Sequence, residues 1–86
     1  MKNKIRNRIK KFEFQKEILL NLANGYSYKE IQKKFNLTDY EIRFCAKFLY
    51  EKYNATNKIS LVYQAICSKD IDLTKIKSWL NLSTNK

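Results

Sequence analysis

Apolar residues recur every three or four positions along most of this chain, which is the spacing of one face of an α-helix. The first such stripe predicts a helix over residues 12–24. Its members are Phe14, Ile18, Leu19 and Leu22. Gly25 follows directly and can adopt the left-handed conformation that often ends a helix.

The next two predicted helices each begin with a capping box, in which a Ser or Thr and a Glu three positions later bond to each other's backbone. Ser27 and Glu30 form the first such pair. Thr38 and Glu41 form the second. The two predicted helices cover residues 28–35 and 39–53.

A very short link joins these two helices, because only Asn36 and Leu37 precede the second cap. Helices on so short a link cannot lie side by side as a long hairpin, so they must cross steeply. Asn also tolerates a left-handed turn better than most residues do. The pattern therefore predicts a helix-turn-helix.

Two further helices are predicted downstream, over residues 57–67 and 72–81. Thr56 is expected to cap the first and Asp72 the second. The last helix is expected to turn three apolar residues inward, Ile76, Trp79 and Leu80.

The opening segment is a basic N-terminal arm without an acidic residue. Ile5, Ile9 and Phe12 share one helical face, which favours a helix, whereas the charge density equally favours disorder without a partner. Such an arm can follow a DNA backbone or enter the minor groove. The expected divisions are the arm (1–11), a helix-turn-helix domain (12–67) and a C-terminal helix with its tail (68–86).

Composition supports an all-α fold, because 86 residues with one glycine and no proline suit few strand-and-turn architectures. No apolar run approaches the length of a membrane span, so no membrane partner is expected. The chain has no histidine, no glycine-rich phosphate loop and no Cys-His pair, and its two cysteines fit no metal-binding spacing. We therefore expect neither enzymatic activity nor a cofactor or metal.

The formal net charge of +10 indicates a polyanionic partner, nucleic acid ahead of an anionic membrane. A chain rich in Lys, Asn and Ile is also what an AT-rich genome produces. The first eleven residues hold six of the 18 basic side chains, which leaves 12 basic against 8 acidic residues in the remainder. Charge alone therefore leaves nucleic-acid binding open.

The most distinctive motif is Gly-Tyr-Ser-Tyr-Lys-Glu-Ile at residues 25–31, which stands at an ungapped distance from Asn57-Lys58. With the other matching segments, it makes residues 17–65 resemble the LuxR/GerE family of bacterial helix-turn-helix regulators, in the solitary, GerE-like form without a sensor domain. The matching segments are residues 17–19, 22–31, 37–38, 42–43, 49–53, 55–58 and 61–65.

The resemblance implies a four-helix domain whose third helix enters the DNA major groove and whose fourth commonly forms a dimer. The chain departs from the family pattern in its opening (Lys11 to Gln15) and in its additional fifth helix. It also carries Glu41 where a threonine is frequent, Cys45 where a histidine is frequent and Asn54 where glycine is usual. The change at Glu41 bears on one phosphate contact.

On the third predicted helix, Ile42, Cys45 and Leu49 form the core stripe, and Arg43 and Lys47 lie one turn apart on the opposite side. Both can reach acceptors on a guanine edge. The family's base-contacting positions fall on Arg43, Phe44 and Lys47. Phe44 can contact a thymine methyl group or fill the core. The expected phosphate contacts are Ser27, Lys29, Thr38, Tyr40 and Lys58.

The fourth predicted helix has more apolar residues than one buried face needs, which leaves Ile59, Tyr63 and Ile66 for a second copy or for cover by the fifth helix. We expect a cytoplasmic transcriptional regulator of bacterial or phage origin, associated with the nucleoid when bound to double-stranded DNA, and a homodimer through this helix. The alternative is a protein-interaction module of the same fold that docks on RNA polymerase or on another regulator.

Overall fold

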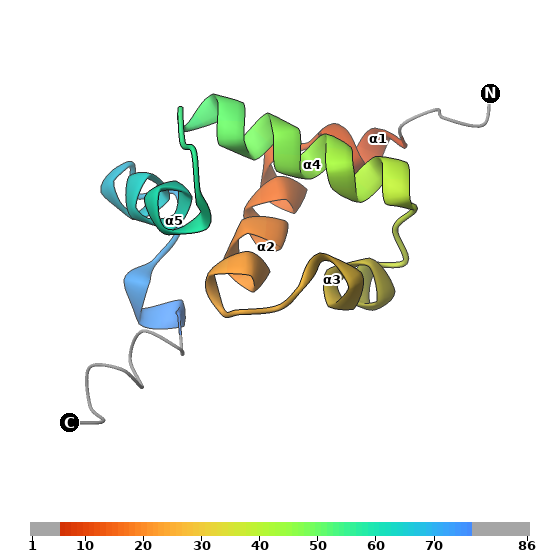
Figure 1. The fold of residues 1–86 in the computed structure, drawn as a ribbon, viewed down its shortest axis with the longest axis horizontal. Coiled ribbons are helices and arrows are strands. Elements are labelled where there is room, and N and C mark those ends of the chain that lie inside the picture. The colour runs from red at the N-terminus through yellow and green to blue at the C-terminus, as the bar shows by residue number, and fades with distance from the viewer. Residues whose placement is uncertain (1–5, 77–86) are drawn as a thin grey trace.

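The computed structural model describes residues 6–76, which form five α-helices and one short 3₁₀ helix without any strand (Figure 1). This confirms the all-α prediction for that part of the chain. None of the helices in this range is long and apolar enough to cross a membrane. The elements are α1 (Asn7–Lys10), α2 (Phe12–Ala23), α3 (Tyr28–Phe35), α4 (Asp39–Lys52), α5 (Lys58–Cys67) and the 3₁₀ helix η1 (Leu73–Lys75).

Helix α2 is the centre of the fold and contacts each of the other α-helices. Its buried stripe includes the predicted Ile18, Leu19 and Leu22. Because α2 ends at Ala23 and Gly25 has a φ of 93°, the chain turns at the predicted glycine. The inner faces of α4 and α5 complete the core with Ile42, Cys45, Leu49, Leu61, Val62 and Ala65.

Helices α3 and α4 begin as predicted, each with a complete capping box. The Ser27 hydroxyl accepts from the Glu30 amide at 3.1 Å, and the Thr38 hydroxyl accepts from the Glu41 amide at 3.0 Å. Between the helices, Asn36 is left-handed with a φ of 56°. Figure 1 shows α3 almost end-on while α4 runs across the view, so the two axes cross steeply.

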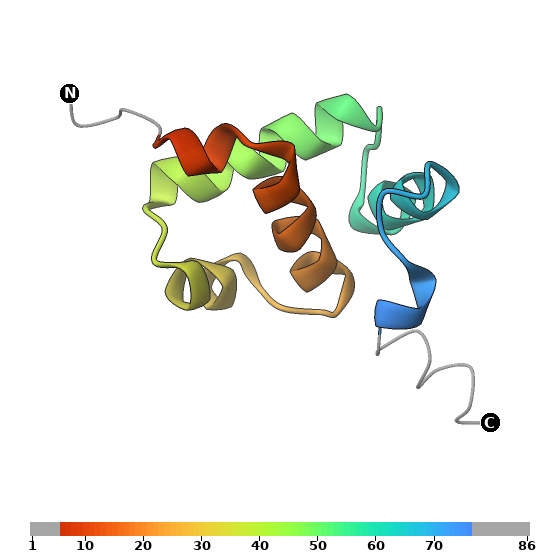
Figure 2. The ribbon, with the colours of Figure 1, turned by 180° about the vertical axis from the view of Figure 1, so that it is seen from behind.

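For the N-terminal segment, which the sequence left open between a helix and disorder, residues 6–11 belong to the folded body and Asn7–Lys10 form a helix. Helix α1 packs on both α2 and α4, and Figure 2 shows it running alongside α4. Ile9 is fully buried, and its carbonyl accepts a hydrogen bond from the Gln15 side chain at 2.8 Å. One apolar side chain thus anchors a segment that is otherwise charged. Ile5 lies outside the described residues.

The C-terminal segment differs from the helix predicted over residues 72–81. The Asp72 carboxylate does cap a helix, accepting from the Thr74 amide at 3.0 Å, but this is the single turn η1. Helix geometry ends at Ile76, which is extended (φ −98°, ψ 90°) and fully buried. An α-helix from Asp72 through Ile76 is therefore not formed. Trp79 and Leu80 lie outside the described residues.

Two smaller differences concern helix starts and side-chain direction. Asn57, not Thr56, caps α5, because the Asn57 side chain accepts from the Ser60 amide at 2.8 Å. The spacing of α3 would place Tyr28 on the same face as the buried Ile31, but Tyr28 is 41% exposed.

Candidate nucleic-acid interface

The outward face of α4 carries a continuous stripe of side chains opposite its buried stripe. The stripe lines a surface groove of about 490 Å³, which we call the α4 groove. Its residues are Tyr40, Arg43, Phe44, Lys47, Phe48 and Glu51. The helix therefore packs one side against the core, and its other side carries cations and aromatic rings on the surface.

Arg43 and Lys47 are the cations of the α4 groove, and both are exposed. Within the described part of the chain, neither side chain makes a hydrogen bond or an ion pair. They lie four residues apart, which places them on adjacent turns of the same face. Two positive groups are thus held close together with their bonding capacity unused.

Three aromatic rings line the same groove. Tyr40 is 44% exposed and Phe48 is 37% exposed. Exposed apolar groups that share one groove can mark an interaction site. Phe44 is half-buried: it packs against the core, as one of its two predicted alternatives requires, and it also lines the groove. We did not predict roles for Phe48 and Glu51, although Phe48 continues the four-residue spacing of Tyr40 and Phe44.

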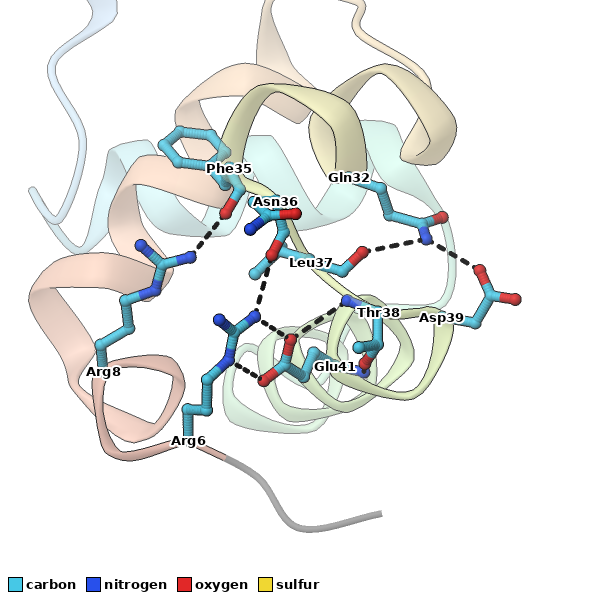
Figure 3. A network of polar contacts seen from close by, with 9 residues as sticks. All are labelled: Arg6, Arg8, Gln32, Phe35, Asn36, Leu37, Thr38, Asp39 and Glu41. Atoms are coloured by element: carbon cyan, nitrogen blue, oxygen red, sulfur yellow. Dashed lines mark hydrogen bonds and ion pairs between the residues drawn. The ribbon is translucent and has the colours of Figure 1, made fainter. Parts of the chain in front are cut away.

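Glu41 lies at the start of α4, nearly buried at 2% exposure, and it forms an ion pair with Arg6 (Figure 3). The pairing is bidentate, with 2.7 Å from Arg6 Nε to Glu41 Oε2 and 2.5 Å from Nη2 to Oε1. The Arg6 hydrogen bonds outweigh burial and lower the pKa of Glu41 to about 2, helped by the Thr38 amide. The Glu41 carboxylate is thus paired with a cation of the same chain.

The same N-terminal segment also closes the end of α3. Arg6 donates to the Asn36 carbonyl at 2.9 Å, and Arg8 donates to the Phe35 carbonyl at 2.5 Å (Figure 3). Carbonyls at a helix C-terminus lack partners within the helix and attract positive charge. Gln32 adds a bond across the turn, since its amide donates to the Leu37 carbonyl at 3.3 Å and to Asp39 Oδ1 at 2.8 Å. We call the contacts of Arg6 and Arg8 the arginine clamp.

Sequence reasoning missed the arginine clamp, because its partners lie 27 to 35 positions away in the chain. Arg6 and Arg8 were counted only as basic-arm residues. A possible signal was Glu41 itself, since an acid on the inner side of a predicted helix needs a cation.

The predicted phosphate contacts lie on several elements. Ser27 caps α3 and Lys29 is exposed in its first turn, so these two are neighbours. Thr38 caps α4, and Tyr40 lies in the α4 groove. Lys58 is the exposed first residue of a different helix, α5. Four of the five predicted phosphate contacts therefore lie at the starts of α3 and α4.

The predicted dimer residues divide into two kinds. Ile59 is 75% exposed and Tyr63 is 58% exposed, one turn apart on α5. Ile66 is half-buried and packs against the chain's own core. The exposed apolar face of α5 is therefore narrower than predicted, and η1 does not bury Ile59 or Tyr63.

The cysteines are free thiols with different surroundings. Cys45 is fully buried, and burial raises its pKa to about 11, so it packs as a small apolar group. Cys67 is exposed. In the described range, no group of three or more His, Cys, Asp or Glu residues is arranged to hold a metal ion.

Comparison with known proteins gives no match: no family model, no curated protein and no solved structure is similar to this chain. The resemblance to LuxR/GerE regulators therefore stays an expectation from the sequence.

Proposed function

We propose that this protein is a transcriptional regulator that binds double-stranded DNA at specific sequences. In this proposal α3 and α4 act as a helix-turn-helix of the LuxR/GerE type, and α4 enters the major groove. The observation that carries it is the pair of exposed cations on the outward face of α4, Arg43 and Lys47, which have no hydrogen-bond or ion-pair partner among residues 6–76.

The chemistry of the major groove suits these two residues. The groove is about 12 Å wide and admits one helix, and a guanine edge there offers two acceptors. Arg43 can donate to both acceptors at once, and Lys47 can reach one on an adjacent base pair. The half-buried Phe44 beside them completes the predicted base-contacting set.

The surroundings of α4 support contacts with the phosphate backbone. Phosphate oxygens are attracted to helix starts that carry free amides and a nearby cation. Ser27 and Lys29 provide this at α3, and Thr38 and Tyr40 add hydroxyl groups at α4. The arginine clamp helps, because it cancels the charge of Glu41, which would otherwise repel a phosphate at this position.

We further propose a homodimer through the α5 face formed by Ile59 and Tyr63. Two copies related by a two-fold axis would place their α4 helices about 34 Å apart, which is one turn of DNA. A regulator of this kind acts in the cytoplasm and is associated with the nucleoid when bound.

The second candidate function is a protein-interaction module that docks on RNA polymerase or on another regulator. The observation in its favour is the set of exposed rings in the α4 groove, since aromatic side chains are enriched in protein interfaces.

Selection of bound sequences from random duplex DNA tests the proposal. We expect a palindromic consensus, and we expect the Arg43→Ala variant to bind about 1–3 kcal/mol more weakly with relaxed preference at one base pair. Lys75→Ala, which removes one exposed charge from η1 at the far end of the molecule, is the matched control (Figure 1). An absence of enrichment over the random pool would reject the proposal in favour of the protein-interaction module.

A further inference from the structure

We propose that the α4 groove selects thymine, through contacts between the rings of Tyr40, Phe44 and Phe48 and the 5-methyl groups of thymines that flank the base pair bound by Arg43. This inference rests on the proposed function, because it states which bases the same face recognises. The sequence alone offered Phe44 as one such contact, and the structure adds the other two rings and their common groove.

The spacing of the rings is the first reason. Tyr40, Phe44 and Phe48 are separated by four residues each and all line one groove. At a rise of 1.5 Å per residue, the ring stripe extends over about 12 Å of the helix. Base pairs in B-DNA are about 3.4 Å apart, so this length corresponds to three or four consecutive pairs.

The chemistry of the groove is the second reason. In the major groove, the thymine methyl is the apolar group that distinguishes one base pair from another, and aromatic and small apolar side chains contact it. Polar side chains could serve equally well at positions that only approach water or phosphate. Rings at three of six groove positions, two of them exposed and one half-buried, therefore indicate a partner that is apolar in places and anionic overall.

The state of Phe44 favours duplex DNA over unpaired bases. Binding of single strands uses rings whose flat faces are free for stacking. Phe44 is half-buried against the core, so only part of its ring is open. A methyl group needs only such a partial contact.

The charges of the groove give the proposed binding a direction. Arg43 and Lys47 lie between the rings, whereas Glu51 closes the C-terminal end. A carboxylate repels phosphate, but it can accept from a cytosine amino group. We infer that Tyr40 to Phe48 lie against the bases and that Glu51 marks where the helix leaves them.

The test replaces each thymine of the selected duplex, one at a time, by uracil, which differs only by the missing methyl group. Binding of the full chain is measured by fluorescence anisotropy at fixed salt. We expect a loss of about fourfold in affinity for each contacted methyl, which corresponds to the burial of one methyl-sized group. The losses should fall within three or four neighbouring base pairs.

Protein variants make the test specific. Phe48→Ala removes a ring that is 37% exposed, and Tyr40→Ala removes one that is 44% exposed, so neither opens a cavity in the core. For each variant we expect one thymine whose replacement by uracil no longer changes the affinity, because the ring that contacted its methyl group is missing. Replacement at the other contacted thymines should still weaken binding. Phe44→Leu tests the third ring, because leucine removes the ring and keeps an apolar side chain next to the core. Circular dichroism checks that each variant is folded.

The possible failures are distinct. If the protein selects a site but uracil substitution changes no affinity, thymine selection is overturned and the proposed DNA-binding function stands. If the protein binds no duplex more tightly than a basic peptide of equal charge, both proposals fail and the rings belong to a protein interface. If discrimination persists in all three ring variants, the methyl contacts come from other residues and the inference is wrong.

Discussion

Two pairs of basic residues in this protein look alike in the sequence and differ completely in their surroundings. Arg6 and Arg8 are occupied by their own chain, bonding to Glu41 and to the carbonyls of Asn36 and Phe35. Arg43 and Lys47 bond to nothing in the range 6–76. The first pair holds two helices together, and the second pair is free for a partner.

The difference shows what a net charge can and cannot indicate. A basic segment next to a folded domain suggests a nucleic-acid-binding arm, yet residues 6–11 use two of their cations to complete the fold. Because the arginine clamp holds the turn between α3 and α4, it fixes the position of the α4 groove relative to α3. The following predictions separate the two roles.

The largest effect is expected from Ile9→Ala, which tests whether the N-terminal segment is structural. Ile9 is fully buried, so its truncation leaves a cavity and should cost about 2–5 kcal/mol of unfolding free energy. Urea denaturation measures this, with the exposed Lys10→Ala as control. A cost below about 0.5 kcal/mol, typical of a surface site, would mean that the segment is an arm after all.

Lys47→Ala tests the role of the exposed pair Arg43 and Lys47. We expect a loss of about 1–3 kcal/mol in binding to the selected duplex, and a change in stability within about 0.5 kcal/mol. Arg8→Ala should give the opposite pattern, with lower stability and little loss of affinity once the protein is folded. Equal effects of the two substitutions on affinity would remove the distinction between the pairs.

A smaller effect is expected from Lys29→Ala at the start of α3. Loss of one phosphate contact should weaken all DNA sequences alike and lower the slope of log affinity against log salt by about one. Titrations at several salt concentrations measure the slope. A slope equal to that of the wild type would show that Lys29 touches no phosphate.

The smallest effect is expected from the Arg6–Glu41 pair. It is a change in unfolding free energy that appears only when the pH is lowered. Bonding to Arg6 lowers the pKa of Glu41 from 4.5 to about 2 in the folded state. The stabilisation is therefore complete above the unfolded pKa and is lost as the pH falls from about 5 towards 2. Chemical denaturation across this range should show a weaker pH dependence for Glu41→Gln. Identical profiles would contradict the pairing.

Local signals explain most of what the sequence predicted correctly. The caps Ser27 and Thr38, the left-handed Asn36 and the core stripe of α4 depend on neighbours within a few residues. Asn54, directly after α4, is also left-handed, with a φ of 50°. Interactions of this range are encoded by spacing alone.

Long-range contacts explain what was missed. The Arg6–Glu41 pair joins positions 35 residues apart, and no pattern of spacing connects them. The single turn η1 replaces the start of a predicted fifth helix because Ile71 and Ile76 are both buried and Asn24 donates to the Lys75 carbonyl at 3.2 Å. The width of the α5 face likewise depends on packing, which turned Ile66 inward.

The most direct test of DNA binding through α4 is a titration of ¹⁵N-labelled protein with the selected duplex, followed by amide and arginine side-chain NMR signals. We predict the largest shifts along residues 39–51 and at Ser27 and Lys29, together with a shifted Arg43 side chain and unchanged Arg6 and Arg8 side chains. Shifts confined to the N-terminal segment or to α2, with α4 unaffected, would contradict the account.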